Sequence, residues 1–222
     1  SAVIFVRDDS GNWIFFQELL HPEPGATPDP GFGSTVLVDG DFVIIGGGNK
    51  AGGTNYDGVL YVFRRTAGGR WTHHQTIIAS GDQRWLNVLE ASDGWVFAAH
   101  DYLPRIEVFR RLEGGFYEYD ETIDESGTDG YNGSFTCLKS NGSWLAAGNP
   151  YSEDSRGEVK LYQTSSNGWE IRQTISGPTM TIQPVQGSEF GHSLLIQQDE
   201  LIVAAWYEPS LFDSPSGKVF SF

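Results

Sequence analysis

One pattern recurs four times along this chain of 222 residues, and it constrains the fold more than any other feature. An aromatic anchor residue is followed four positions later by Gln or Glu and six positions later by an aliphatic residue. Successive anchors are 58, 46 and 52 residues apart, a period typical of proteins built from repeated supersecondary units. The four copies read Trp13/Gln17/Leu19, Trp71/Gln75/Ile77, Tyr117/Glu121/Ile123 and Trp169/Gln173/Ile175.

Two predicted β-hairpins accompany each anchor. A β-branched and aromatic strand precedes the anchor strand, and the turn between them contains Gly or Asn, residues that accept a positive φ. A second hairpin follows, with a tight turn such as Asp39-Gly40 or Asn141-Gly142. Its leaving strand is a continuous apolar run, which favours a strand buried on both faces. The leaving strands are 42–46, 95–99, 144–148 and 201–205.

Four strands per unit and a period near fifty predict an all-β chain, a β-propeller of about four four-stranded blades. A linear β-solenoid is the alternative, but its repeats are usually shorter and lack paired hairpins. Helical periodicity and a Pro/Ser-rich linker are absent, so we expect a single domain over 1–222. Its repeat units are predicted at 2–57, 58–104, 105–156 and 157–216, followed by a closing strand at 217–222.

The closing blade has two candidates for the same strand. Residues 2–6 and 218–222 both match the strand that precedes an anchor, so the N- and C-terminal strands compete for the last sheet or share it. One alternative is a ring closed by both termini. The other is that the surplus strand pairs with a second copy, because an exposed strand edge is a template for β-augmentation.

The consensus of these copies resembles the FG-GAP repeat of integrin α-subunit propellers. It contains Phe-Gly-x-Ser, an Asp-Gly turn, small residues ending the leaving strand, then Gly-x-Val-x-Val-Phe and Trp-x-x-x-Gln. The first copy has Phe32-Gly33-Ser34 and the fourth has Phe190-Gly191-His192, whereas Leu86-Asn87 and Gly133-Ser134 depart from Phe-Gly. The resemblance implies a propeller used for ligand recognition rather than any activity.

Calcium is where the chain departs from that family. Many FG-GAP repeats carry an Asp-x-Asp-x-Asp-Gly loop, because calcium needs several oxygen ligands from one compact turn. The corresponding turns here supply at most one or two acidic groups, as in Asp39-Gly40-Asp41. We therefore predict no metal site and no cofactor.

Charge and composition restrict the partners. The formal net charge of −15 excludes nucleic acid and anionic membrane surfaces as partners, and no run of about 18 apolar residues predicts membrane insertion. The single cysteine, Cys137, is predicted to be a small buried side chain rather than a nucleophile. Glycosylation triplets at Asn132 and Asn141 slightly favour an extracellular or organellar compartment, with any targeting segment absent from this sequence.

Polar and aromatic residues follow the leaving strands, where loops of a propeller usually meet near the axis. Such residues stack on sugar faces, hydrogen-bond to hydroxyl groups or anchor a protein partner. The four sets differ, so we expect one asymmetric ligand site rather than four equal ones. The candidates are Asn49, His100, Asp101, Tyr102, Asn149, Tyr151, Trp206 and Tyr207.

Catalytic motifs are missing from the sequence. The adjacent pair His100 and Asp101 faces opposite ways on a strand and cannot form an oriented dyad. We therefore expect no catalytic residues and predict a non-catalytic interaction module. It would bind a protein partner, or copies of itself through edge-strand pairing, possibly as a structural scaffold. A carbohydrate-binding, lectin-like propeller is the alternative, and a hydrolase or lyase with a site on the axial loops ranks third.

Overall fold

The computed structural model describes residues 1–22, 31–50, 56–79, 86–100, 103–125, 134–177, 188–208 and 216–222. For residues 48–50, 56, 57, 154, 206–208 and 216 it describes the backbone alone. The chain divides into two compact units, Ser1–Leu89 and Glu90–Phe222, and each unit is described by itself. The expectation of a single domain over 1–222 stays a prediction.

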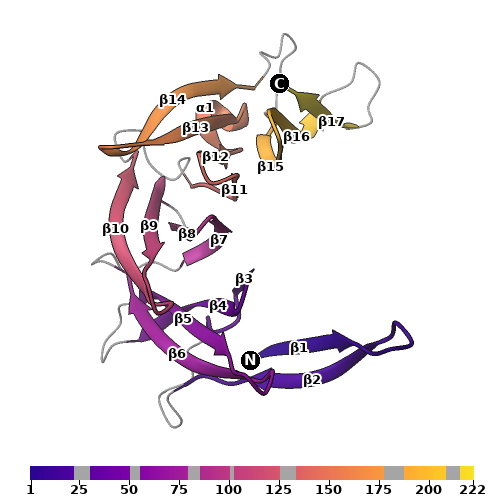
Figure 1. Cartoon of the computed structure of the whole chain (residues 1–222). Helices are drawn as coiled ribbons and strands as arrows, with labels where there is room; N and C mark the ends of the chain where they lie inside the picture. The colour runs from indigo at the N-terminus through magenta and orange to yellow at the C-terminus, as the bar shows by residue number, and fades with distance from the viewer. Residues whose placement is uncertain are drawn as a thin grey trace. The chain divides into compact units, whose positions relative to one another are not determined.

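The first unit contains a hairpin and a four-stranded antiparallel sheet (Figure 1). The hairpin pairs β1 with β2, and the sheet has the order β3-β4-β5-β6. Side chains from β2, β4 and β5 form its core cluster, which includes Ile45 and Val59, both fully buried. The strands are β1 (Ala2–Arg7), β2 (Trp13–Leu19), β3 (Thr35–Asp39), β4 (Phe42–Lys50), β5 (Tyr56–Arg65) and β6 (Trp71–Ile78).

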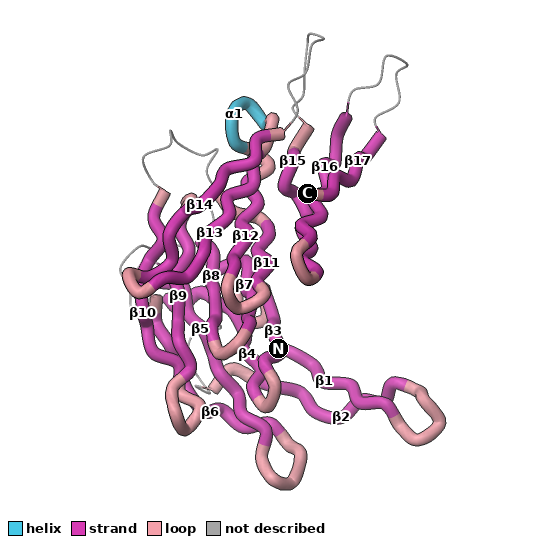
Figure 2. The backbone as a smooth tube through the Cα atoms, turned by 45° about the horizontal axis from the view of Figure 1, so that its top comes forward, coloured by secondary structure: helices cyan, strands magenta, loops and turns pink. Residues whose placement is uncertain are grey.

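Three further sheets follow, of which the first begins with β7 at the division between the units. Their strand orders are β10-β9-β8-β7, β11-β12-β13-β14 and β15-β16-β17. A four-residue helix, α1, precedes β13 (Figure 2). The elements are β7 (Leu86–Ser92), β8 (Trp95–His100), β9 (Arg105–Arg111), β10 (Tyr117–Asp124), β11 (Cys137–Ser140), β12 (Trp144–Asn149), α1 (Ser152–Ser155), β13 (Glu158–Ser165), β14 (Gly168–Ser176), β15 (Phe190–Gln197), β16 (Glu200–Glu208) and β17 (Ser216–Ser221).

The all-β prediction and the four-stranded repeating sheet are confirmed. Each predicted leaving strand is the second strand of its sheet, and those in the second unit are buried where the apolar runs require it, as at Phe97, Leu145 and Val203. Helix α1 was not predicted, because four residues are too few to show a helical period. No helix in the described residues is long and apolar enough to cross a membrane.

The described residues show how each terminal strand pairs. Strand β17 pairs with β16 as the third strand of the last sheet, and the pairing continues to Phe222, which exchanges two backbone hydrogen bonds with Leu201. Strand β1 pairs with β2. The C-terminal strand is therefore the third strand of the last sheet, and the closure of a blade by one or both termini stays a prediction.

A bulge occurs at the same place in all four anchor strands. The register with the preceding strand shifts so that one residue, three positions after each anchor, has no Cα partner. A one-residue bulge reverses the alternation of side chains along a strand. The anchor and the Gln or Glu that follows it therefore lie on opposite faces of their sheet. The unpaired residues are Phe16, His74, Asp120 and Arg172.

The backbone conformation at each Phe-Gly pair requires the glycine. Gly33 and Gly191 adopt φ of +93° and +92°, a region that side chains with a Cβ rarely enter. A Cβ on Gly191 would also lie 2.6 Å from the carbonyl oxygen of Glu158. The glycine allows the first strand of the sheet to begin against the backbone of its neighbour.

Candidate functional site

A buried histidine–glutamate pair lies where β8 ends. Residue His100 is the last residue of β8, and Glu107 lies on β9 opposite Ala98. Their side chains are on the same face of the sheet, because residues two apart on a strand point the same way. The Nε2 of His100 and Oε1 of Glu107 are 3.2 Å apart, a hydrogen bond in which an ionised carboxylate can only accept. Both side chains are completely buried.

The second ring nitrogen of His100 is left without a partner. Its Nδ1 is buried and accepts no hydrogen bond within the described part of the chain. With Nε2 donating to the carboxylate, a neutral imidazole carries its lone pair on Nδ1. A carboxylate that fixes one nitrogen of a histidine and leaves the other as a proton acceptor is the arrangement of an oriented general base.

Other copies of the repeat have a different polar side chain at the position of Glu107. The position of Glu107 is held by Tyr61 in β5 and by Lys160 in β13, and each bonds to the residue eight positions after the preceding anchor. That residue is His21 in the first case and Glu125 in the second. In the two remaining copies the same position is Ala79 or Gly177, neither of which offers a polar side chain.

In the next sheet, Lys160 holds the position of Glu107, and the polar side chains around it are hydrogen-bonded to one another. The Nζ of Lys160 donates to Oε2 of Glu125 at 2.7 Å, and the hydroxyl of Tyr162 donates to Oε1 of the same carboxylate at 3.2 Å. Burial, followed by the neighbouring Glu125 charge, raises the pKa of Tyr162, so its hydroxyl stays protonated. This cluster ties two sheets of the second unit together.

Most of the predicted ligand residues lie in strands rather than in loops. Asn49 is in β4, and Trp206 and Tyr207 are in β16, so the prediction of loop positions for them is wrong; for these three the structure describes the backbone alone. The leaving strands run further than the apolar pattern indicated, because their last residues still pair with the next strand, as at Asn49 and Asp57. Asp101 and Tyr102 lie outside the described residues.

His100 and Asn149 also lie in strands, at the ends of β8 and β12. Asn149 is 3% exposed and its Oδ1 has no hydrogen-bond partner among the described residues. Tyr151, by contrast, is exposed beside the start of helix α1. The structure therefore places His100 and Asn149 at equivalent, buried positions of two sheets, and Tyr151 on the surface.

Sequence reasoning missed Glu107 as the partner of His100. It considered Asp101, the adjacent residue, whereas the partner lies seven residues away across a strand pair. The signal was available: two antiparallel strands with a short connection place such residues on one face. Glu107 is also the one acidic residue in the middle of an otherwise apolar strand, Ile106 to Phe109.

Cys137 is partly buried at the start of β11. Burial, as the largest cause, raises the pKa of its thiol. The protonated thiol agrees with the predicted structural side chain, although the residue is less buried than expected.

Comparisons with known proteins identify a β-propeller-like fold. No family model matches the sequence, and no curated protein matches it either. A solved structure of a Lactobacillus plantarum protein aligns with a TM-score of 0.63 at 13% identity and covers 96% of this chain and 62% of its own length. A putative 6-phosphogluconolactonase from Bacteroides uniformis aligns with a TM-score of 0.54 at 12% identity and covers 95% of this chain and 60% of its own.

This chain therefore spans about three fifths of the length of both structures. At such identities the likeness establishes the fold, and the residues of the site have to be argued from this chain.

These neighbours correct the functional prediction. A non-catalytic interaction module, whether for protein partners, a scaffold or glycans, was expected from the missing catalytic motifs. The fold is shared with a protein named as a lactonase, a hydrolase class. Whether the chain catalyses a reaction stays a prediction. The search for linear motifs could not report a pair such as His100 and Glu107, which is assembled across two strands.

Proposed function

We propose that this chain is part of a hydrolytic enzyme, with His100 as the proton acceptor and Glu107 as the residue that orients it. The observation that carries the proposal is the unpartnered Nδ1 of an imidazole whose Nε2 is bonded to a buried carboxylate. A fully buried polar atom without a partner costs about 1–3 kcal/mol, so its presence favours a functional reason. The lactonase name of one structural neighbour supports the reaction class.

The proposed reaction is the hydrolysis of a lactone. Water attacks the ring carbonyl carbon while Nδ1 of His100 takes one of its protons, and Glu107 stabilises the imidazolium that forms. The tetrahedral intermediate then breaks its ring carbon–oxygen bond. The imidazolium returns the proton to the departing ring oxygen, which becomes a hydroxyl group, and the product hydroxy acid releases a proton to solution.

Charge favours an uncharged sugar lactone over a phosphorylated one. The net charge of −15 repels a phosphate group, and Lys160, a buried cation in the described part of the second unit, is already bonded to Glu125. A neutral sugar lactone has no such conflict. The phosphate in the name of the Bacteroides uniformis protein is therefore not carried over to this chain.

We also propose the finer architecture from the repeat. Four anchor copies and sheets of four antiparallel strands support a propeller with about four blades in this chain. The Phe-Gly pairs at Gly33 and Gly191, both with positive φ, support the resemblance to the FG-GAP repeat.

The proposal is tested by following acid release in a pH-stat with δ-gluconolactone and with its 6-phosphate, each corrected for spontaneous hydrolysis. The variants are His100→Gln and Glu107→Gln, with His192→Gln as the control, since that histidine is exposed on β15. We expect a loss of about 100-fold or more for His100→Gln and an unchanged rate for the control. Circular dichroism establishes that each variant is folded.

Two results would overturn the proposal. One is a rate with the wild-type chain that does not exceed spontaneous hydrolysis of either lactone. The other is a folded His100→Gln variant with the wild-type rate. Preference for the phosphorylated lactone would reject the substrate class and leave the role of His100 standing.

A further inference from the structure

An arginine lies beside the histidine–glutamate pair, on the same face of its sheet. The register of the two strands pairs Ala99 with Ile106. Its continuation places His100, the last residue of β8, opposite Arg105, the first residue of β9. Side chains at directly opposite positions of antiparallel strands share a face, with Cβ atoms about 4.5–5.5 Å apart. Glu107 is two residues further along β9, so all three side chains project from the same face at this end of the sheet.

Both the backbone and the side chain of Arg105 are fixed. The backbone N–H of Arg105 donates to the carbonyl of Leu103 at 2.8 Å. The carbonyl of Pro104 accepts a hydrogen bond of 2.9 Å from the N–H of Glu125. Nη2 of the guanidinium donates a hydrogen bond of 2.6 Å to Oδ2 of Asp124, the residue opposite Arg105 on β10. The guanidinium is thus oriented before any ligand binds, as efficient electrostatic stabilisation requires.

This group of side chains reaches solvent through Arg105 and Asp124. The side chains of His100 and Glu107 are 0% exposed, whereas those of Arg105 and Asp124 are 20% and 35% exposed. A guanidinium has five N–H donors, and one carboxylate cannot occupy all of them. Arg105 can therefore bind an oxygen of a ligand while it remains paired with Asp124.

Arg105 is specific to this copy of the repeat. The same position is Val59 in β5 and Glu158 in β13. A valine side chain has no hydrogen-bond donor, and an ionised glutamate only accepts. Of the three four-stranded sheets, the one that contains His100 is therefore also the one with a side-chain donor at this position.

The pairing with Asp124 restricts which ligand oxygen fits. The carboxylate of Asp124 balances the charge of Arg105, so the two side chains present N–H donors with no net positive charge. A phosphate or carboxylate ligand would compete with Asp124 for the guanidinium, whereas a carbonyl oxygen can accept a hydrogen bond beside it. When water adds to a carbonyl carbon, this oxygen becomes negatively charged, and hydrogen bonds from a cation to it become stronger.

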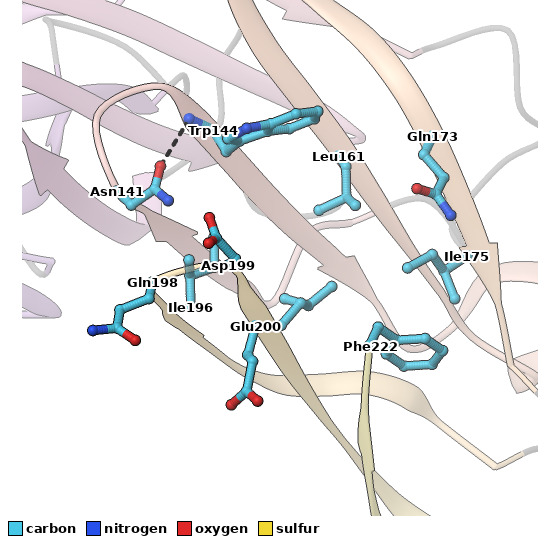
Figure 3. Close-up of a pocket in the computed structure, with 11 residues that line it drawn as sticks. Asn141, Trp144, Leu161, Gln173, Ile175, Ile196, Gln198, Asp199, Glu200 and Phe222 are labelled. Atoms are coloured by element: carbon cyan, nitrogen blue, oxygen red, sulfur yellow. Dashed lines mark hydrogen bonds between the residues drawn. The ribbon is translucent and has the colours of Figure 1, made fainter.

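The cavity drawn in Figure 3 is a different place. It has a volume of about 450 Å³ and lies between the last two sheets of the second unit, where Trp144 and Phe222 line it. His100, Arg105 and Glu107 lie outside its lining. The lactone proposed as the substrate is therefore not assigned to this cavity.

We propose that Arg105 is a second catalytic residue of the proposed hydrolysis. It binds the carbonyl oxygen of the lactone and stabilises the negative charge that this oxygen gains in the tetrahedral intermediate. Asp124 is the positioning residue that orients the guanidinium. This inference rests on the proposed function, in which His100 accepts the proton of water. Arg105 transfers no proton: its hydrogen bonds strengthen when water adds and weaken when the ring carbon–oxygen bond breaks and the carbonyl group re-forms.

Steady-state kinetics of δ-gluconolactone hydrolysis in the pH-stat give the first test. We expect Arg105→Gln to lower kcat about 100-fold, the loss that follows removal of one donor to an oxyanion. KM should change little, because the contact is strongest in the transition state. Arg105→Lys keeps the charge but not the planar fork of donors, and should recover part of the rate. Asp124→Asn should lower kcat by less than Arg105→Gln does.

Arg172→Gln is the matched control. Arg172 also forms an ion pair, with Glu170 at 3.0 Å on β14, and its side chain is 44% exposed. This variant should leave kcat and KM unchanged. Urea unfolding establishes that each variant is folded under the assay conditions. A folded Arg105→Gln variant with the wild-type kcat would overturn the proposal. A rise in KM alone would overturn it too, because Arg105 would then bind only the ground state.

A binding measurement keeps the two proposals apart. δ-Gluconolactam has the same carbonyl group and resists hydrolysis, and nitrogen-15 NMR follows the Nε–H resonance of Arg105 when the lactam is added. We expect this resonance to shift in the wild type and also in His100→Gln, which lacks the proton acceptor. A shift without lactone hydrolysis would retain Arg105 as a ligand-binding residue and reject the hydrolysis. Hydrolysis without a shift would reject Arg105 and leave the role of His100 standing.

Discussion

Trp169→Ala is the substitution that tests the repeat most sharply. The Trp169 side chain is 6% exposed and fills the space between two sheets of the second unit, against Trp95 and Phe97. Truncation to Ala leaves a cavity where the indole was, and for a buried Trp this costs about 3–5 kcal/mol of unfolding free energy. The Nε1 of Trp169 has no hydrogen-bond partner among the described residues, so its burial in the folded state is unfavourable. Removing it offsets part of the loss, and we therefore expect the lower end of that range, about 3 kcal/mol.

Trp13→Ala is the matched control, because Trp13 holds the same position in the repeat. Its side chain is 69% exposed, and we expect a change within about 0.5 kcal/mol. The assay is urea unfolding followed by far-ultraviolet circular dichroism, at a concentration where sedimentation shows a monomer. Equal losses of unfolding free energy in the two variants would refute the reasoning. They would mean that burial between two sheets does not make Trp169 contribute more stability than Trp13.

Three further predictions follow from named contacts. Burial, as the largest cause, raises the pKa of Glu121 above 4.5, so the ionised carboxylate destabilises the folded state. Glu121→Gln introduces the residue found in the other three copies and should raise the melting temperature at pH 7. This gain should vanish as the pH falls below 4.5, because the carboxyl group is then protonated in both the folded and the unfolded state. Gly191→Ala should lower the unfolding free energy by about 1–3 kcal/mol in urea titrations, whereas Gly40→Ala, with φ of +59° and nothing within 4 Å of the added Cβ, should cost less. Lys160→Met should destabilise the chain in the same titration by more than the double variant Lys160→Met/Glu125→Gln, because the single change leaves a partly buried carboxylate without its ammonium partner.

The repeat was readable from the sequence because its signals are local. Anchor spacing, turn residues and apolar leaving strands each act within a few residues, and they predicted the hairpins and the four-stranded sheets. The bulge after each anchor was not readable. It changes the pairing by one residue, as at Asp120, and leaves the hydrophobic pattern almost unaltered.

The sequence could not rank the two terminal strands. Residues 2–6 and 218–222 match the same position of the repeat, and the pairing of β17 with β16 is visible only in the structure. The histidine–glutamate pair was missed although its signal was present, because its two residues lie seven positions apart on paired strands and form no linear motif.

The central claim is that His100 holds its lone pair on Nδ1, and nitrogen-15 NMR of the histidine-labelled chain at pH 7 measures this directly. We predict that Nε2 of His100 carries the proton and that Nδ1 is unprotonated, with the Nδ1 resonance shifting when δ-gluconolactone is added. Glu107→Gln should weaken the preference for this tautomer. A proton found on Nδ1, with Nε2 unprotonated and unaffected by Glu107→Gln, would contradict the account.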